Sequence, residues 1–564
     1  MKNQFFLLTL VGLMLGACED FLEVSPKGEL SENVFETSED AVEGVVIGVY
    51  SMLNGQYNQI TNAHRSGPSN WVYGDVVSDD AYKGSSGISD GSDVHQLEVF
   101  QADASVQAVL VKWEACYEGI SRANRAINII SNFPHWSESK KNLRLAEVRV
   151  LRGHYYFELK KVFDQIAYID ETMSVADLKK VTNTAYTSDQ LWDKIEADFR
   201  FGAQHLPAVQ ADVGRMTSVV ANAYLAKSHL FQQEWAAADA ALDEVIANPG
   251  QHHLMSDFEQ IFLLNINENG AEFCPECIFS VQHSLDPTLP SSTPDVGATY
   301  GWDGNVGDRL SGLGGPYPRV YGFHKPSQNL VNAFKTNADG LPVIDFNRSN
   351  VSLTTPVDPR LDHTVGRPGI PFLDAGIYEE SWTRGVSTYG PFAGKKQLYS
   401  PSGNQVMDIP YYTNSENYCI LRFADVYLMK AEVLIEQGDL NGGRAYINLV
   451  RERAKNAPVV TAMDSSPAAP YAISTYDDSF ASYEEAIWAL RTERRLEFAM
   501  EGHRFFDLVR WGIAKDVMNE YLRVEKTRRP YMESAIFEKK HEYFPIPATE
   551  VDLSEGRFTQ RKNY

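Results

Sequence analysis

Apolar residues recur every three or four positions through a long block of the chain, residues 109–249. In its first part the repeating positions are Trp113, Tyr117, Ile120, Ala123, Ile127 and Ile130. Because an α-helix completes a turn every 3.6 residues, this spacing gathers the apolar side chains on one face and predicts an amphipathic helix. The same period predicts helices over 143–163 and 191–206, and two Ala-rich helices within 219–249. The block is therefore expected to be helical throughout.

The last two of these helices meet at a short turn, 232–235, and Pro249 ends the second helix. Small residues, Ala226 and Ala238, stand where the helices must approach, and the unit resembles a tetratricopeptide helix pair. The pattern returns in a second block, 420–515, where a turn at 437–440 separates two helices and a further long helix is expected over 483–511. The two blocks predict one helical frame interrupted by a large insertion.

The segments 54–108 and 250–419 differ from the helical blocks in composition. They are rich in Gly, Pro, Ser and Asn, the residues of turns and loops. Short apolar pieces at 277–282 and 411–420 predict strands within the second segment. Long ordered loops on a rigid scaffold are frequent positions of binding residues. The sequence therefore predicts a mainly α fold, with a helix-pair scaffold over 109–249 and 420–515 and two loop-rich ligand-binding regions that contain short strands.

The N-terminus carries the features of a secretory signal. A basic residue, Lys2, precedes an apolar run over 5–15, which is about half the length that crosses a bilayer. The run ends in Leu-Gly-Ala-Cys at 15–18, which resembles the bacterial lipobox, so residues 1–17 are expected to be removed and Cys18 to carry the lipid. The alternative is a soluble secreted protein with an incidental cysteine. No later apolar run approaches spanning length, so we expect a mature protein that stands on a membrane.

Charge narrows the class of partner. The chain of 564 residues carries 51 basic and 75 acidic residues, a net charge of −24. Such a balance repels nucleic acids at long range and argues against them as partners. Aromatic residues make up 12% of the chain, enough for a core and for stacking surfaces on the outside.

Cysteines and histidines offer little metal or redox chemistry. Cys274 and Cys277 have the spacing of half a zinc ribbon, but no second pair follows, so we expect a local disulfide or two free thiols. His252 and His253 lack a third ligand at helical spacing and are interpreted as loop residues. A last group, Asp303, Asn305 and Asp308, does not complete a calcium loop and is better explained by turns. We expect neither a metal nor a cofactor.

A stripe of alternating charge marks the expected helix over 483–511. Arg494, Glu497, Glu501 and Arg504 fall at spacings of three, four and three, which places them on one helical face where opposite charges can pair. The arginines would hold both glutamates ionised. We therefore interpret the stripe as a structural charge network and not as a catalytic pair.

The stripe and the lipobox together resemble the SusD/RagB family of outer-membrane nutrient-binding lipoproteins. The residues that carry the resemblance in this helix are Arg494, Arg495, Glu497, Glu501, Gly502, Arg504, Asp507, Leu508, Arg510 and Trp511. Two further stretches fit the family, one through Arg422, Asp425, Tyr427, Ala431 and Glu432 and one through 544–547 with the terminal 560–564. The resemblance covers both termini and the helices between them, and leaves the insertion uncovered.

The resemblance implies a single domain over 18–564 with four tetratricopeptide-like helix pairs and an irregular ligand-binding region. Proteins of this kind stand on the outer membrane, face the cell exterior and cap a SusC-like TonB-dependent β-barrel transporter. They bind oligosaccharides or polysaccharides, or in some members peptides, and deliver them for import. They are binding proteins without a catalytic site. The stripe described above is then structural.

Sugar binding requires aromatic rings that stack on pyranose faces and polar groups that pair with the hydroxyls. Two loops supply both kinds of residue. Trp302 stands among glycines and is the first candidate, with Tyr300 and Asn305 beside it. The second loop, which resembles the family segment near the ligand surface, supplies Trp71, Tyr73, Asp79, Asp80 and Tyr82. Weaker candidates are Tyr317, Tyr321 and Trp382.

Two other functions compete with glycan capture. The same fold could capture peptides, which would bind through backbone-pairing groups and acidic side chains. A surface glycosidase would need two carboxylates flanking a cleft, about 5–10 Å apart. Asp79 and Asp80 are neighbours in the chain, and neighbours need not converge on one ligand.

Overall fold

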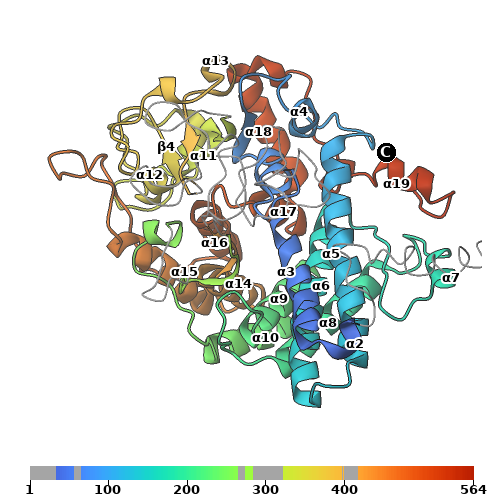
Figure 1. Cartoon of the computed structure of the whole chain (residues 1–564). Coiled ribbons are helices and arrows are strands. Elements are labelled where there is room, and N and C mark those ends of the chain that lie inside the picture. Colours follow the sequence, from blue (N-terminus) through green and yellow to red (C-terminus); the bar gives the residue numbers. More distant parts are fainter. Residues whose placement is uncertain (1–33, 56–64, 264–272, 284–321, 397, 399–416) are drawn as a thin grey trace, which may run out of the picture.

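A computed structural model describes most of the chain beyond the expected signal segment (Figure 1). The described residues are 34–55, 65–263, 273–283, 322–396, 398 and 417–564. The expected signal segment, Cys18 and the candidates Tyr300, Trp302 and Asn305 lie outside them, as do Asp303, Asp308, Tyr317 and Tyr321.

The first helical block is present as predicted. It consists of α5 (Gln107–Asn132), α6 (Glu138–Phe163), α8 (Ser188–His205), α9 (Ser218–Phe231) and α10 (Trp235–Ala247). Each helix packs on the next, α5 on α6, α6 on α8, α8 on α9 and α9 on α10. Side chains define the starts: Thr187 and Gln190 form a capping box at α8, and Ser137 accepts a hydrogen bond from the Lys140 N–H at α6.

The second block continues the same stack in space although the insertion separates the two blocks in sequence. It consists of α14 (Phe423–Glu436), α15 (Leu440–Asn456) and α16 (Tyr483–Glu497), and α14 packs on α10 (Figure 1). Ion pairs cross this junction: Lys430 contacts Asp239 and Asp243 at 2.5 and 2.6 Å, and Lys227 contacts Asp425 at 2.8 Å. The expected helical frame with a large insertion is confirmed.

The prediction of one long helix over 483–511 is wrong in one respect, because a turn divides this segment into two helices. α16 ends at Glu497, and α17 (Arg504–Arg510) begins after a turn. Met500 and Gly502 adopt left-handed backbone conformations, with φ of 66° and 74°, which a helix does not contain. The four charges of the predicted stripe therefore do not share one helical face, and they pair with residues from other segments.

Short antiparallel strands connect distant loop segments. β1 (Ala81–Gly84) pairs with β3 (Phe323–Pro326), β2 (Cys277–Val281) with β6 (Tyr418–Arg422), and β4 (Val365–Gly366) with β5 (Ala393–Gly394). The strand predicted near 277–282 is confirmed as β2, and the end of the strand predicted over 411–420 is confirmed as the start of β6, whereas residues 411–416 lie outside the described residues. The β1–β3 pairing joins the two loop-rich regions to each other.

The cysteine expectation is wrong. Cys277 forms a disulfide with Cys419, and Cys274 and Cys116 are free thiols. The two bonded cysteines are 142 residues apart in sequence, yet the pairing of β2 with β6 brings their Cα atoms to 5.6 Å. This distance lies within the range that a disulfide spans.

Other helices lie before, between and after the elements described above. The N-terminal ones are α2 (Val34–Thr37), α3 (Glu39–Tyr50), a π-helical turn (Trp71–Val76), α4 (Ser92–Glu98) and α7 (Val175–Leu178). The later ones are α11 (Gln328–Ala333), α12 (Arg360–Thr364), α13 (Val386–Tyr389), α18 (Ala514–Arg528) and α19 (Ala548–Leu553). In the described part of the chain, no helix combines the length and apolar character needed to cross a bilayer.

Candidate functional site

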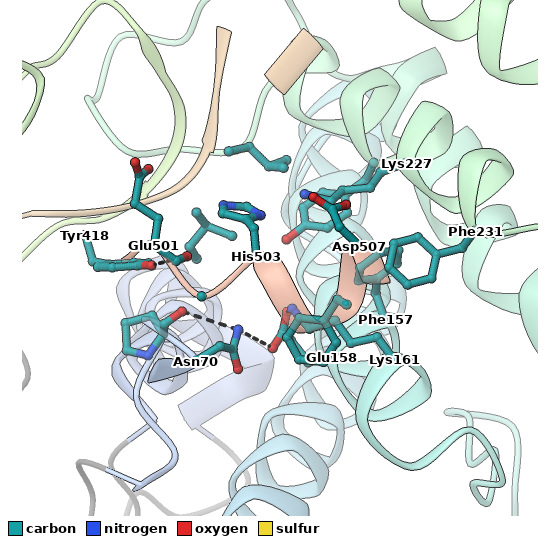
Figure 2. Close-up of a pocket in the computed structure, with 16 residues that line it drawn as sticks. Asn70, Phe157, Glu158, Lys161, Lys227, Phe231, Tyr418, Glu501, His503 and Asp507 are labelled. Carbon is teal, nitrogen blue, oxygen red and sulfur yellow. Dashed lines mark hydrogen bonds and ion pairs between the residues drawn. The ribbon is translucent and has the colours of Figure 1, made fainter. Parts of the chain in front are cut away.

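A pocket opens where the helical frame meets strand β6 and the turn before α17 (Figure 2). Its volume is about 480 Å³ when the part open to solvent is included. α6 and α9 form one wall, and β6 and the residues around His503 form the other. Pro68 and Asn70, which precede the π-helical turn, complete the lining.

Aromatic rings form the wall that the two helices supply. Phe157 on α6 packs edge-on against Phe231 and Tyr224 of α9, with ring centroids 5.2 and 5.5 Å apart. Across from them, the Lys161 ammonium lies 4.4 Å from the centroid of the Phe506 ring, a cation–π contact. Phe157 and Tyr224 are 1% exposed and Phe506 is 6% exposed. The half-buried Phe231 is therefore the most accessible of these four rings beside the charged groups.

Glu158 is the central anion of this wall. It accepts hydrogen bonds from Asn70 Nδ2 at 3.0 Å and Lys112 Nζ at 2.9 Å, and Lys161 Nζ lies 2.5 Å from its other oxygen. Burial opposes ionisation, but the two ammonium groups outweigh it and hold the pKa of Glu158 well below its usual value. Burial lowers the pKa of Lys161 to about 8.

The opposite wall carries two more carboxylates and a histidine. Asp507 accepts from Arg494 Nε at 3.0 Å and Arg510 Nε at 2.8 Å; against the effect of burial, these arginines lower its pKa to about 2. Glu501 behaves alike, because Arg422 and Lys396 outweigh its burial and lower its pKa. Burial, and then the nearby Lys227, lower the pKa of His503 to about 3, so its ring is neutral at physiological pH.

This electrostatic arrangement suits binding better than acid–base catalysis. All three carboxylates among the described lining residues are held ionised by basic partners, and a general acid must hold a proton at working pH. Charged groups that are held in place by their partners can still accept hydrogen bonds from a ligand's hydroxyls or donate hydrogen bonds to them.

The three aromatic candidates of the 71–82 segment lie in the core. Trp71, Tyr73 and Tyr82 are at most 1% exposed. Tyr73 Oη donates to the Ala108 carbonyl at 2.6 Å, and Tyr82 Oη donates to Glu525 Oε2 at 2.7 Å. The π-helical turn and β1 direct these rings inward, so in this structure they offer no face to a sugar, contrary to the expectation.

Asp79 and Asp80 are also buried, and neither lines the pocket. Arg495 contacts Asp79 at 3.0 Å and Asp80 at 2.8 Å, and Arg504 contacts Asp79 at 2.8 Å. Burial raises the pKa of Asp80 to about 6, whereas Arg495 and Arg504 outweigh the burial of Asp79 and lower its pKa to about 2. The pair has unequal proton affinities, but its position within the protein gives it no route to a glycan.

Trp382, a weaker candidate, packs in a small apolar cluster with Phe372 and Tyr378 and is 9% exposed. His252 lies in a loop, as expected. The roles of Tyr300, Trp302 and Asn305 stay predictions. Sequence reasoning missed the pocket residues Phe157, Glu158 and Lys161, which it assigned to the scaffold. Their one signal is that Glu158 and Lys161 stand three residues apart beside the aromatic run 155–157 of α6.

Three further side chains lie close enough together to hold a metal ion. Ligand atoms of Glu196, His229 and Glu234 lie within 4.8 Å of one another. However, Arg200 and Gln232 already contact the oxygens of Glu196, and His229 Nδ1 lies 2.7 Å from Glu234. Hydrogen bonds and ion pairs account for this cluster.

Comparisons with known proteins agree over nearly the whole chain. A family model described as "SusD family" matches residues 276–564, and one described as "Starch-binding associating with outer membrane" matches residues 20–230. A SusD-like protein, P25, from Formosa agariphila is 24% identical over 95% of this chain and 94% of its own length.

Solved structures show the same fold. A "Laminarin binding SusD-like protein" superposes with a TM-score of 0.68 at 22% identity, over 93% of this chain and all of that one. Surface glycan-binding protein A from Bacteroides thetaiotaomicron, in complex with laminarihexaose, superposes with a TM-score of 0.66 at 20% identity, over 94% of this chain and all of that one.

Proposed function

Because the chain belongs to the SusD family, we propose that it is a surface lipoprotein that binds an oligosaccharide or polysaccharide and passes it to a partner β-barrel transporter. The observation that carries the proposal is the family match over both halves of the chain, 20–230 and 276–564. A fold neighbour that holds laminarihexaose supports a glycan as the ligand.

The lipid anchor is part of the proposal. The Leu-Gly-Ala-Cys sequence at 15–18 supports cleavage before Cys18 and acylation of that residue. A disulfide such as Cys277–Cys419 persists in oxidising compartments and supports export of the chain. The description "associating with outer membrane" supports the destination, and we propose that the protein faces the exterior.

The proposed ligand contacts come from two places. The pocket of Figure 2 offers the half-buried ring of Phe231 together with the amide and charged groups that hydroxyls require. Trp302, with Tyr300 and Asn305, is proposed as an aromatic contact from the segment 284–321. The described segment that leads into this part of the chain ends beside the pocket strand, because the Asn417 side chain bonds the backbone N–H of His283 at 2.7 Å.

We propose that the protein does not cleave its ligand. The ionised state of Glu158, Glu501 and Asp507 supports this, since hydrolysis of a glycosidic bond requires one carboxylic acid that retains its proton. The proposed transporter partner is a SusC-like TonB-dependent barrel, and the family assignment supports it.

The test uses the purified protein in native gels cast with single polysaccharides, including laminarin, xylan, mannan, pectin and starch. We expect retardation in at least one gel, confirmed by calorimetry with its oligosaccharides, and no reducing ends released on long incubation. Binding of a mixed peptide pool with no retardation by any glycan would support the peptide alternative instead. Release of sugar that a single carboxylate substitution abolishes would overturn the non-catalytic assignment.

The anchor is tested separately in cells fed an alkyne-labelled fatty acid. We expect the wild-type chain to incorporate the label and to sediment with outer membranes. The Cys18→Ala variant should lose the label. A wild-type chain that stays unlabelled would contradict the anchor and leave the glycan test unaffected.

A further inference from the structure

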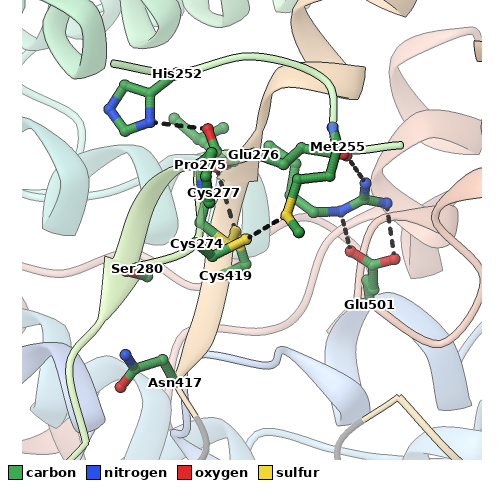
Figure 3. The surroundings of a disulfide bond; sticks show 12 residues. His252, Met255, Cys274, Pro275, Glu276, Cys277, Ser280, Asn417, Cys419 and Glu501 are labelled. Carbon is green, nitrogen blue, oxygen red and sulfur yellow. Dashed lines mark hydrogen bonds and ion pairs between the residues drawn. A yellow bond between two sulfur atoms is a disulfide. The ribbon is translucent and has the colours of Figure 1, made fainter. Parts of the chain in front are cut away.

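Three cysteines gather at the junction of β2 and β6 (Figure 3). Cys277 is bonded to Cys419, and Cys274 is a free, half-buried thiol three residues before Cys277. All three belong to one apolar cluster that includes Phe258 and Met255. The Cys274 thiol donates to the Met255 sulfur at 3.5 Å.

The backbone places Cys274 within bonding reach of Cys277. The Cys277 N–H donates to the Cys274 carbonyl at 3.0 Å, which closes a four-residue turn over Pro275 and Glu276. The end Cα atoms of such a turn are less than about 7 Å apart, and disulfides join Cα atoms about 4.4–6.8 Å apart. Cys277 therefore has two partners in reach, one across the strands and one across the turn.

We propose that Cys274 is a thiol–disulfide exchange site, which converts the Cys277–Cys419 disulfide into a Cys274–Cys277 disulfide and releases Cys419. The inference does not depend on the nature of the ligand. It uses only residues of this chain and rests on the turn that places Cys274 and the Cys277–Cys419 disulfide side by side.

The exchange is balanced without an external oxidant. The Cys274 thiolate attacks Cys277 Sγ, the bond to Cys419 Sγ breaks, and Cys419 leaves as a thiolate that takes up a proton. One disulfide and one thiol are present before and after the step. The net change is a proton lost by Cys274 and a proton gained by Cys419.

The surroundings of Cys274 set its rate. Burial raises the pKa of the Cys274 thiol to about 11, and Glu276 adds to this effect, whereas the backbone N–H groups of the turn and Arg422 oppose it. Arg453 contacts Glu276 at 2.9 Å, and His252 lies 3.3 Å from the Pro275 carbonyl on the other side of the turn. The thiolate is therefore scarce at neutral pH, and its fraction rises about tenfold per pH unit below the pKa.

The exchange changes a covalent tie beside the pocket. The Cys277–Cys419 disulfide fastens β6 to β2, and Tyr418, Ile420 and Leu421 of β6 line the pocket. After the exchange, β6 is held to β2 by backbone pairing, by the Arg422–Glu276 ion pair and by the hydrogen bonds of Asn417 to Gln282 and His283. The site thus provides a redox-neutral way to loosen one wall.

The test maps disulfides in the full exported chain. Samples are incubated at about pH 7 and about pH 9.5, quenched with acid, alkylated and digested with pepsin, and the linked peptides are identified by mass spectrometry. We expect the 277–419 linkage at neutral pH, and at high pH a growing fraction with the 274–277 linkage and Cys419 alkylated. The rate should rise about tenfold per pH unit.

Two matched cysteine-to-serine variants sharpen the result. Cys274→Ser should keep the 277–419 linkage at both pH values, whereas Cys116→Ser, which removes the other free thiol of the described chain, should exchange as the wild type does. Wild-type protein that retains 277–419 alone after prolonged incubation at high pH would overturn the proposal. Equal exchange in Cys274→Ser would overturn it as well. The disulfide mapping does not require a glycan, so a failure to bind glycan in the separate test would not change its interpretation.

Discussion

The guanidinium of Arg422 donates from Nε to Glu501 Oε2 at 2.8 Å and from Nη2 to Glu501 Oε1 at 3.0 Å, inside the protein. Arg422 precedes α14, and Glu501 lies in the turn that separates α16 from α17. The same guanidinium contacts Glu276 at 2.5 Å and Glu497 at 2.9 Å. One buried arginine thus joins the turn before β2, the helical frame and the wall of the pocket.

Arg422→Ala should therefore destabilise the protein strongly. It leaves buried carboxylates without their shared partner, a change that costs about 3–5 kcal/mol of unfolding free energy in comparable pairs. Urea unfolding measures it. The control Arg523→Ala removes an arginine that is 69% exposed and paired with Glu520, and should leave the unfolding free energy nearly unchanged. Equal losses in both variants would contradict the central role of Arg422.

The free energy of unfolding should fall as the pH falls, and His503 should contribute to this decrease at the higher pH values of the range. Its folded pKa is about 3 against 6.5 for the free side chain, so the unfolded state binds its proton first and folding is penalised below about pH 6.5. Asp507, with a folded pKa of about 2 against 3.8, adds stability that is lost only at lower pH. His503→Gln should flatten the dependence of the unfolding free energy on pH between about pH 6.5 and 4, measured by urea unfolding at several pH values.

Gly74→Ala should be harmful because two backbones meet there. A Cβ at position 74 would lie 2.0 Å from the Gly502 carbonyl oxygen, and Gly502 itself is left-handed. Relief requires backbone movement, so we expect a loss of about 2–3 kcal/mol or more in thermal or urea unfolding. Gly48→Ala in α3 meets nothing within 4 Å and should be neutral or slightly stabilising. An unchanged unfolding free energy in Gly74→Ala would show that the backbone of the turn at 498–503 can move at little cost.

Tyr73→Phe should separate a core role from a binding role. It removes the hydroxyl that bonds the Ala108 carbonyl and should cost about 1 kcal/mol of stability while leaving the Kd for glycan unchanged.

Trp302→Ala should weaken glycan binding about fivefold, which is the equivalent of about 1 kcal/mol for a stacked ring. Calorimetry with the glycan found in the gels measures both. A weaker Kd for Tyr73→Phe at unchanged stability would reverse this assignment.

Phe231→Ala tests the pocket directly. The ring is half-buried on α9 and packs against Phe157, so its removal opens the aromatic wall and should weaken glycan binding about fivefold. Tyr483→Ala, which removes a ring that is 41% exposed on α16, is the matched control and should bind as the wild type does. An unchanged Kd in Phe231→Ala would remove the pocket from the proposed site.

The helical frame was predictable because its information is local. Apolar residues at helical spacing mark α5 and α6, and the caps at Ser137 and Thr187 define the starts of α6 and α8. The break in the helix after Glu497 was not predictable, because the apolar period continues through it. Only the approach of Gly502 to Gly74 requires the left-handed turn there.

The direction of side chains in the loop regions was likewise out of reach. Trp71, Tyr73 and Tyr82 have the composition of a sugar site, and composition does not tell whether a ring faces solvent or the core. The sequence pattern assigns Glu158 and Lys161 to the helical scaffold, and the structure shows that their helix also lines a pocket.

The sequence alone determined the family, the mainly helical scaffold and the short strands, because periodicity and motifs are encoded in residues close together along the chain. The tertiary structure decided the Cys277–Cys419 bond, the partners of the buried charges and the place of the pocket. These depend on which distant segments meet, and residues 70, 158, 418 and 503 line one pocket only when the helical frame has packed against the loops that interrupt it.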